Sequence, residues 1–168
     1  MIRRLRGSIP GVRWVEPDLA HFTMAFLGEQ PDPQRAGAAL ARAAAAAPAF
    51  RAKFGAPGVF DSWDRPRIIW LGLTRGAEAM ALLAEAVREE LSAESVSFDP
   101  KPFVPHLTLG RVKSRAPDNL HRSVEDVFQG ADLPEMRFET AEIAVSKTGP
   151  SGSVYSIARR ERLGRGQT

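Results

Sequence analysis

The stretch that decides the fold reads His21-Phe22-Thr23-Met24-Ala25-Phe26. Its larger apolar residues recur at every second position, as the period of a β-strand requires, so we predict a strand over residues 19–28. A second stretch, His106-Leu107-Thr108-Leu109-Gly110-Arg111, repeats the order His, apolar, Thr, apolar, small about half a chain length later, within a strand predicted over residues 104–112. The repeat indicates two related lobes, each of which lends one strand to a shared cleft.

The elements expected around these strands define the fold class. Capping residues, prolines and apolar residues at helical spacing predict helices over residues 33–47, 77–91 and 118–130, and a short arginine-rich one over residues 2–9. Apolar or alternating runs predict further strands over residues 50–60, 68–73, 136–146 and 154–160. Few helices and many strands that can pair as hairpins predict an α+β fold. We expect two pseudo-symmetric lobes of antiparallel sheet, with flanking helices around a central cleft.

Composition narrows the class of protein. The chain has 168 residues, of which 43% are hydrophobic and 26% charged, so it is expected to fold as a single domain over residues 1–168. No apolar run approaches the ~20 residues that span a bilayer, and no secretory signal is present, so we expect a cytoplasmic protein without membrane contact. The formal net charge of +3 permits an anionic ligand without requiring one.

The absence of cysteine restricts the chemistry. It excludes disulfide frameworks, thiol nucleophiles, zinc ribbons and iron–sulfur clusters, and it leaves the histidines His21, His106 and His121 as the side chains suited to proton transfer. The acidic residues show no spacing typical of metal ligands, so a zinc site is not expected.

The repeat carries a consistent chemistry. His and Thr lie two residues apart in each copy, so both side chains share one face of a strand. A threonine hydroxyl can donate to a phosphate oxygen, and an imidazole can take up or release a proton near neutral pH. Two such pairs that face each other could therefore supply a general base and a general acid around a phosphate. One His-x-Thr arises often by chance, whereas two copies in matched contexts indicate a function.

Other candidates have weaker support. His121 falls in the predicted third helix beside Arg122, where we expect a surface position. Trp63 and Trp70 are able to stack on a nucleobase. Trp70 lies in an apolar strand and is expected in the core, whereas the loop position of Trp63 leaves both interpretations open.

The paired His-x-Thr pattern resembles the signature of the 2H phosphoesterases, and the chain is similar to the bacterial RNA 2′,3′-cyclic phosphodiesterases, historically named 2′-5′ RNA ligases. The resemblance extends from about residue 11 to residue 160. The segments that carry it are residues 12–17, 21–29, 66–72, 101–111 and 146–155. It implies a bilobal α+β enzyme without metal or other cofactor that hydrolyses a 2′,3′-cyclic phosphate at an RNA end to a 2′-phosphomonoester. We expect a monomer.

The resemblance also assigns roles. It makes His21 the proton donor to the departing 3′ oxygen and His106 the proton acceptor that activates water, whereas the symmetric repeat alone leaves these two roles open. It makes Thr23, Thr108 and Arg111 substrate-binding residues. Simple alternation places Arg111 on the strand face opposite His106, so a bulge or a strand end must turn it back.

Several alternatives remain at this stage. The enzyme could carry out 2′-5′ RNA ligation, the reverse reaction, or hydrolyse small cyclic nucleotides, or the chain could bind RNA ends without catalysis. Members of the family usually begin with a strand resembling Arg-Leu-Phe-Val-Ala-Ile, which this sequence does not contain. We therefore expect a domain that lacks the N-terminal strand of the family, either because translation starts upstream or because this is a shortened form.

Overall fold

The computed structural model describes residues 9–30, 32–113, 117–149 and 152–164 and divides the chain into two compact units. The segments of the first unit are Met1–Thr23, Lys53–Arg75 and Pro105–Glu135, and those of the second are Met24–Ala52, Gly76–Val104 and Met136–Thr168. The helix predicted over residues 2–9 lies outside the described residues except for its last position. Each unit combines helices with antiparallel strands, so the predicted α+β class is confirmed.

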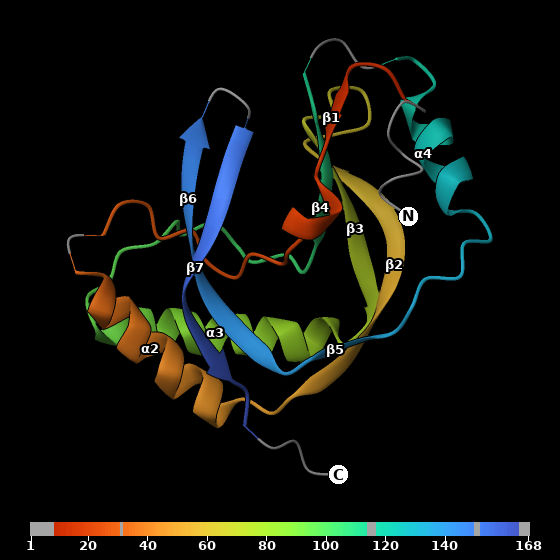
Figure 1. Ribbon diagram of the computed structural model, residues 1–168. Helices are drawn as coiled ribbons and strands as arrows, with labels where there is room; N and C mark the ends of the chain where they lie inside the picture. Colours follow the sequence, from red (N-terminus) through yellow and green to blue (C-terminus); the bar gives the residue numbers. More distant parts are fainter. Residues whose placement is uncertain (1–8, 31, 114–116, 150–151, 165–168) are drawn as a thin grey trace. The chain divides into compact units, whose positions relative to one another are not determined.

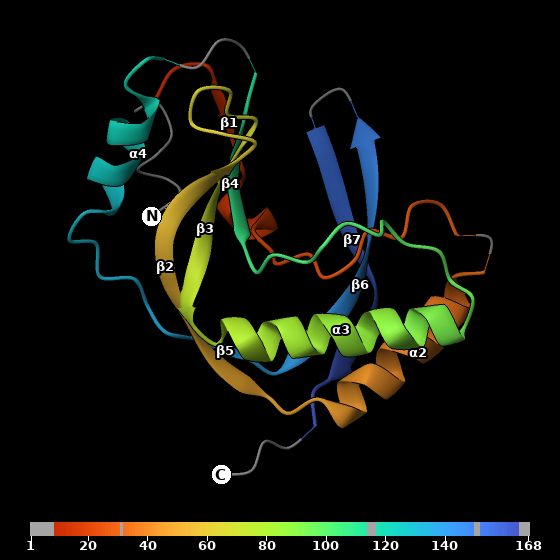
Figure 2. The same cartoon turned by 180° about the vertical axis from the view of Figure 1, so that it is seen from behind.

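The first unit contains an antiparallel sheet in the order β1-β4-β3-β2. Its elements are β1 (Val12–Trp14), the 3-10 helix η1 (Pro17–Leu19), most of β2 (Phe50–Phe60), β3 (Ile68–Arg75), β4 (Leu107–Val112) and α4 (Leu120–Phe128). Strand β2 is divided between the units, and its part from Lys53 onward belongs to the first. Figures 1 and 2 show α4, in cyan, on one side of this sheet. Leu120 and Val124 of α4 form a buried cluster with strand residues such as Ile69, Leu71 and Leu109. Side chains that alternate with these strand residues project from the other face of the sheet.

The second unit packs two helices against a hairpin. Its elements are α2 (Pro33–Ala46), the start of β2 (residues 50–52), α3 (Ala77–Ala93), β5 (Met136–Phe138), β6 (Thr140–Gly149) and β7 (Gly152–Arg162). Figure 1 shows α2, in orange, beside α3, in green. Alanines along α2, including Ala39 and Ala43, pack with the leucines and valine of α3 in a second core, so the alanine-rich run is a packed helix. No helix in the described part of the chain is long and apolar enough to cross a bilayer.

The strand predicted over residues 19–28 is wrong in its extent. Only Phe22 pairs, through an isolated antiparallel bridge to Leu107, and the chain bends at Met24. After this bend the side chains no longer alternate, because Met24 and the adjacent Ala25 both pack against the core of the second unit, while Phe26 is 62% exposed. The period-two pattern therefore reflects an extended segment that passes from one core to another rather than one strand.

Candidate active site

The two His-x-Thr motifs lie side by side in the first unit. The antiparallel bridge between Phe22 and Leu107 sets the register, which places His21 opposite Thr108 and Thr23 opposite His106. Phe22 and Leu107 both pack into the core under α4, so the four polar side chains belong to the other face.

The register also fixes which side chains are neighbours. Directly opposite Cβ atoms in such a pair are ~4.5–5.5 Å apart and diagonal ones ~7–8 Å. Each imidazole therefore lies beside the threonine of the other motif, and the two imidazoles occupy diagonal corners. The expectation that each lobe lends one motif is wrong, since both motifs belong to the same unit.

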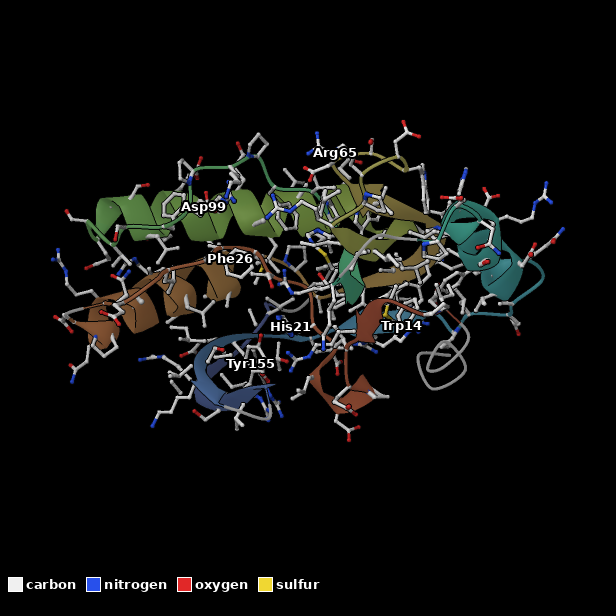
Figure 3. The ribbon with its side chains drawn as sticks, turned by 90° about the horizontal axis from the view of Figure 1, so that it is seen from above. Trp14, His21, Phe26, Arg65, Asp99 and Tyr155 are labelled. Carbon is white, nitrogen blue, oxygen red and sulfur yellow. The ribbon has the colours of Figure 1, made fainter. Side chains whose placement is uncertain are left out.

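His21 is oriented by the backbone of η1. Its Nδ1 lies 2.7 Å from the carbonyl oxygen of Leu19. A carbonyl oxygen only accepts hydrogen bonds, so Nδ1 is the donor in this contact. His21 is exposed on the N-terminal segment that also carries Trp14 (Figure 3).

The imidazole of His106 is held by aromatic side chains. The ring of Phe60 meets it edge to face, with centroids 4.7 Å apart and planes at 88°, and the Trp70 ring lies 6.3 Å away at 63°. Phe60 and Trp70 also contact each other, with centroids at 5.6 Å. This arrangement limits the rotation of the imidazole, so His106 is pre-positioned on the sheet face. The sequence offered no signal for Phe60 beyond its place at the end of an apolar strand.

Trp70 is not a residue of the apolar core, in contrast to the sequence-based expectation. It pairs with Thr108 on one side and Gly58 on the other, and it is half-buried, whereas its neighbours Ile69 and Leu71 are fully buried beneath the sheet. The apolar run contains residues of both faces of the sheet, and the strand register is needed to tell which face each residue occupies. Trp70 therefore shares the face of the histidines.

We expect Gly58→Ala to displace the Trp70 indole. A Cβ at residue 58 would overlap the six-membered ring of this side chain, and a Cβ at Gly72 would lie 3.2 Å from its Cζ3 atom. Overpacking of this kind costs about 1–3 kcal/mol in the free energy of unfolding, measured by urea denaturation. In a Trp70→Leu background the Gly58→Ala substitution should cost much less unfolding free energy, because the indole is absent. If the losses of the two single variants simply add in the double variant, the interpretation is contradicted.

A β-bulge returns Arg111 to the face of the histidines. Trp70 pairs with Thr108 but Ile69 pairs with Gly110, so Leu109 is the extra residue in β4. Beyond the bulge Arg111 pairs with Ile68, which shares its face with Trp70. The irregularity that the predicted role of Arg111 requires is therefore present. Arg111 is exposed and forms no ion pair with the residues that the structure describes.

The remaining histidine lies elsewhere on the first unit. His121 is exposed on α4, where its Nε2 lies 3.1 Å from Glu125 Oε1 and its ring stacks on Trp63 with centroids 4.1 Å apart. Its predicted surface position is confirmed. Trp63 packs against the core under α4, which favours the structural interpretation of this residue.

Two cavities of the first unit lie away from the histidine motifs. A cavity of about 1040 Å³ is lined by residues 61–67 and the start of α4, and another of about 570 Å³ by β2 and the end of α4; neither contains His21 or His106. Among the described residues, no three His, Asp or Glu side chains gather closely enough to hold a metal ion.

The fold, with two His-x-Thr pairs side by side on one sheet face, is that of the 2H phosphoesterases. The chain belongs to the 2′-5′ RNA ligase superfamily, whose family model matches residues 2–150. The resemblance drawn from the sequence motifs is thereby confirmed.

Relatives and solved structures agree with this membership. An RNA 2′,3′-cyclic phosphodiesterase of Thermotoga maritima is 34% identical over 94% of this chain and 82% of its own length. One from Thermus thermophilus is 34% identical over 96% of this chain and 79% of its own. The crystal structure of TT0787 of Thermus thermophilus is 26% identical, with a TM-score of 0.75 over 99% of this chain and 91% of that one. The apo form of Escherichia coli LigT, 23% identical with a TM-score of 0.72 over 98% of this chain and 89% of that one, shares the fold.

Proposed function

We propose that this protein is an RNA 2′,3′-cyclic phosphodiesterase that opens the cyclic phosphate at an RNA end and leaves a 2′-phosphomonoester. The observation that carries the proposal is the cross-strand register, which sets each histidine beside the threonine of the other motif. Curated relatives that carry this activity in their names align with nearly the whole chain and support the same substrate class.

The reaction needs two proton transfers. In the proposed mechanism His106 takes a proton from water as the water oxygen forms a bond to phosphorus. The bond between phosphorus and the 3′ oxygen breaks, and His21 gives the proton on Nε2 to this oxygen. General acid–base catalysis of this kind contributes about 10²–10⁴-fold for each group. The diagonal separation of the two imidazoles leaves room for a phosphate between them.

The remaining residues of the site hold the phosphoryl oxygens. The hydroxyls of Thr23 and Thr108 donate to the oxygens that do not leave, and the guanidinium of Arg111 balances the negative charge that moves among them. The Leu19 carbonyl keeps the His21 ring in one orientation, with Nε2 as the reactive atom. Because these groups supply both the proton transfers and the charge stabilisation, we propose that the reaction does not depend on a metal ion.

The test is the product. An oligoribonucleotide that ends in a 2′,3′-cyclic phosphate is incubated with the protein, and the position of the product phosphate is determined by ³¹P NMR. We expect a 2′-phosphate, formed at the same rate with and without EDTA, and a bell-shaped dependence of the rate on pH because one imidazole must be charged and the other neutral. A 3′-phosphate product would refute the roles of the two histidines, and loss of activity in EDTA would refute metal independence.

A further inference from the structure

We propose that the face of the sheet that bears the histidines continues, beyond Arg111, into a phosphate-binding track formed by Arg13 and Lys113. The track would hold phosphates of an RNA strand upstream of its cyclic end, so that the preferred substrate is an oligoribonucleotide rather than a cyclic mononucleotide. The inference rests on the proposed function for the position of the reacting phosphate.

Strand pairing places the three cations on one face. Arg13 of β1 is the direct partner of Arg111 in β4. The neighbours of Arg13 in β1, Val12 and Trp14, pack into the core under α4, so the Arg13 side chain belongs to the opposite face. Arg13 was not among the predicted site residues, although its place between two apolar residues, Val12 and Trp14, is a sequence signal for this face.

Lys113 extends the track by one further position of the ladder between β1 and β4. Its backbone N–H donates to the carbonyl oxygen of Gly11 at 2.9 Å, which continues the ladder between β1 and β4. Val112 packs toward the core, so Lys113 alternates back to the face of Arg111 and is exposed there. With a rise of ~3.3 Å per residue, Arg111 and Lys113 are ~6.6 Å apart along the strand, a spacing similar to that of successive phosphates in an extended nucleic-acid strand.

The charge arrangement favours an anionic ligand. Arg13 and Arg111 place two positively charged residues directly opposite each other in the antiparallel ladder. Lys113 adds a third positive charge one step farther along the same face. An upstream phosphate on this face could accept charge-assisted hydrogen bonds from Arg13, whose planar guanidinium is well suited to phosphate oxygens.

The track leads away from the catalytic groups in a defined direction. Along β4 the order is His106, Thr108, Arg111 and Lys113. In the proposed mechanism the reacting phosphate lies among the histidines, Thr108 and Arg111, so Arg13 and Lys113 would contact phosphates of nucleotides farther from the cyclic end. A cyclic mononucleotide reaches only the first part of this path, whereas a strand of three or four nucleotides reaches all of it.

The experiment compares two substrates in matched variants. The kcat/KM of Arg13→Gln is measured on a 2′,3′-cyclic mononucleotide and on a tetraribonucleotide with the same terminal base and cyclic phosphate. We expect the preference for the tetranucleotide, the ratio of the two kcat/KM values, to fall about tenfold, as for loss of one charge-assisted contact. The salt dependence of the tetranucleotide reaction should become shallower by about 0.7 in the log–log slope, the value for one phosphate contact on a single strand. Lys113→Gln should act in the same direction.

The controls separate the possible outcomes. Arg122→Gln removes an exposed arginine of α4, on the side of the sheet away from the histidines, and should keep the preference of the parent protein. Arg13→Lys, which keeps the charge, should restore part of the preference. An equal loss on both substrates would place Arg13 at the reacting phosphate and overturn the track, and an unchanged preference and salt slope would overturn it as well.

Failure of the proposed function would be recognised separately. If the parent protein opens neither substrate, the proposed function is refuted. The track is then tested by the Kd of a fluorescent tetraribonucleotide with a 2′-phosphate end, measured by fluorescence anisotropy. A Kd that is the same in Arg13→Gln and Arg122→Gln would refute it, and weaker binding in Arg13→Gln alone would support it.

Discussion

Replacing His106 with alanine lowers kcat on an RNA end with a 2′,3′-cyclic phosphate by about 10²–10⁴-fold, and replacing His21 has an effect of the same order. Each variant removes one of the two proton transfers of the proposed mechanism while the groups that hold the phosphate stay in place. The loss should therefore fall on kcat, with a change of less than about threefold in the Kd of a product strand with a 2′-phosphate. Single-turnover kinetics and product binding measure the two effects.

The third histidine is the matched control. His121→Ala removes an exposed imidazole from α4, and its kcat should match that of the parent protein. Because His106 packs against Phe60, loss of its ring also changes local packing, so His106→Gln is tested alongside and urea denaturation of both variants is compared. A His21 or His106 variant that retains full turnover with unchanged folding would refute the mechanism.

Replacing Thr108 with valine lowers kcat by about 10²-fold, since removal of one donor to developing negative charge has this effect in comparable sites. Thr23→Val should behave similarly, because the register gives both threonines the same relation to a histidine. Valine keeps the branched shape of threonine and suits an extended chain, so the change removes little more than the hydroxyl.

Thr74→Val supplies the control for the threonine variants. The Thr74 hydroxyl donates to the carbonyl oxygen of Phe54 at 3.1 Å in the same sheet. Its loss should lower stability slightly and leave kcat within about twofold of the parent value, because the group touches backbone only. Equal losses of kcat in Thr74→Val and Thr108→Val would show that the effect arises from the sheet rather than from phosphate binding.

The helices and most strands could be predicted from local sequence. Asp32 caps α2 by accepting from the backbone N–H of Gln34 at 3.0 Å, and Pro33 occupies the first turn, as the spacing of these residues predicted. The third helix, predicted over residues 118–130, runs from Leu120 to Phe128. These features depend on residues that lie close together in the chain, so they can be predicted from a single sequence.

Features of the site that depend on pairing between distant segments could not be predicted in the same way. The motif around His21 follows the period of a strand, yet only Phe22 pairs, because Met24 and Ala25 pack against a different core. The role of Arg111 requires a bulge or a strand end, but the position of the bulge at Leu109 follows only from the pairing of β4 with β3. The neighbourhood of Phe60 and His106 likewise follows from register alone.

The single bridge at Phe22 has a consequence for how the protein loses activity. The second motif belongs to the long pairing of β4 with β3. The first motif pairs with β4 through an isolated bridge at Phe22, and the Phe22 ring stacks on Phe54 of β2 with centroids 6.4 Å apart. Regions with few backbone hydrogen bonds open with less free energy than the whole domain needs to unfold. Warming would therefore detach His21 and Thr23 while the rest of the sheet remains folded, and catalysis would end by a local, reversible fraying before the protein melts.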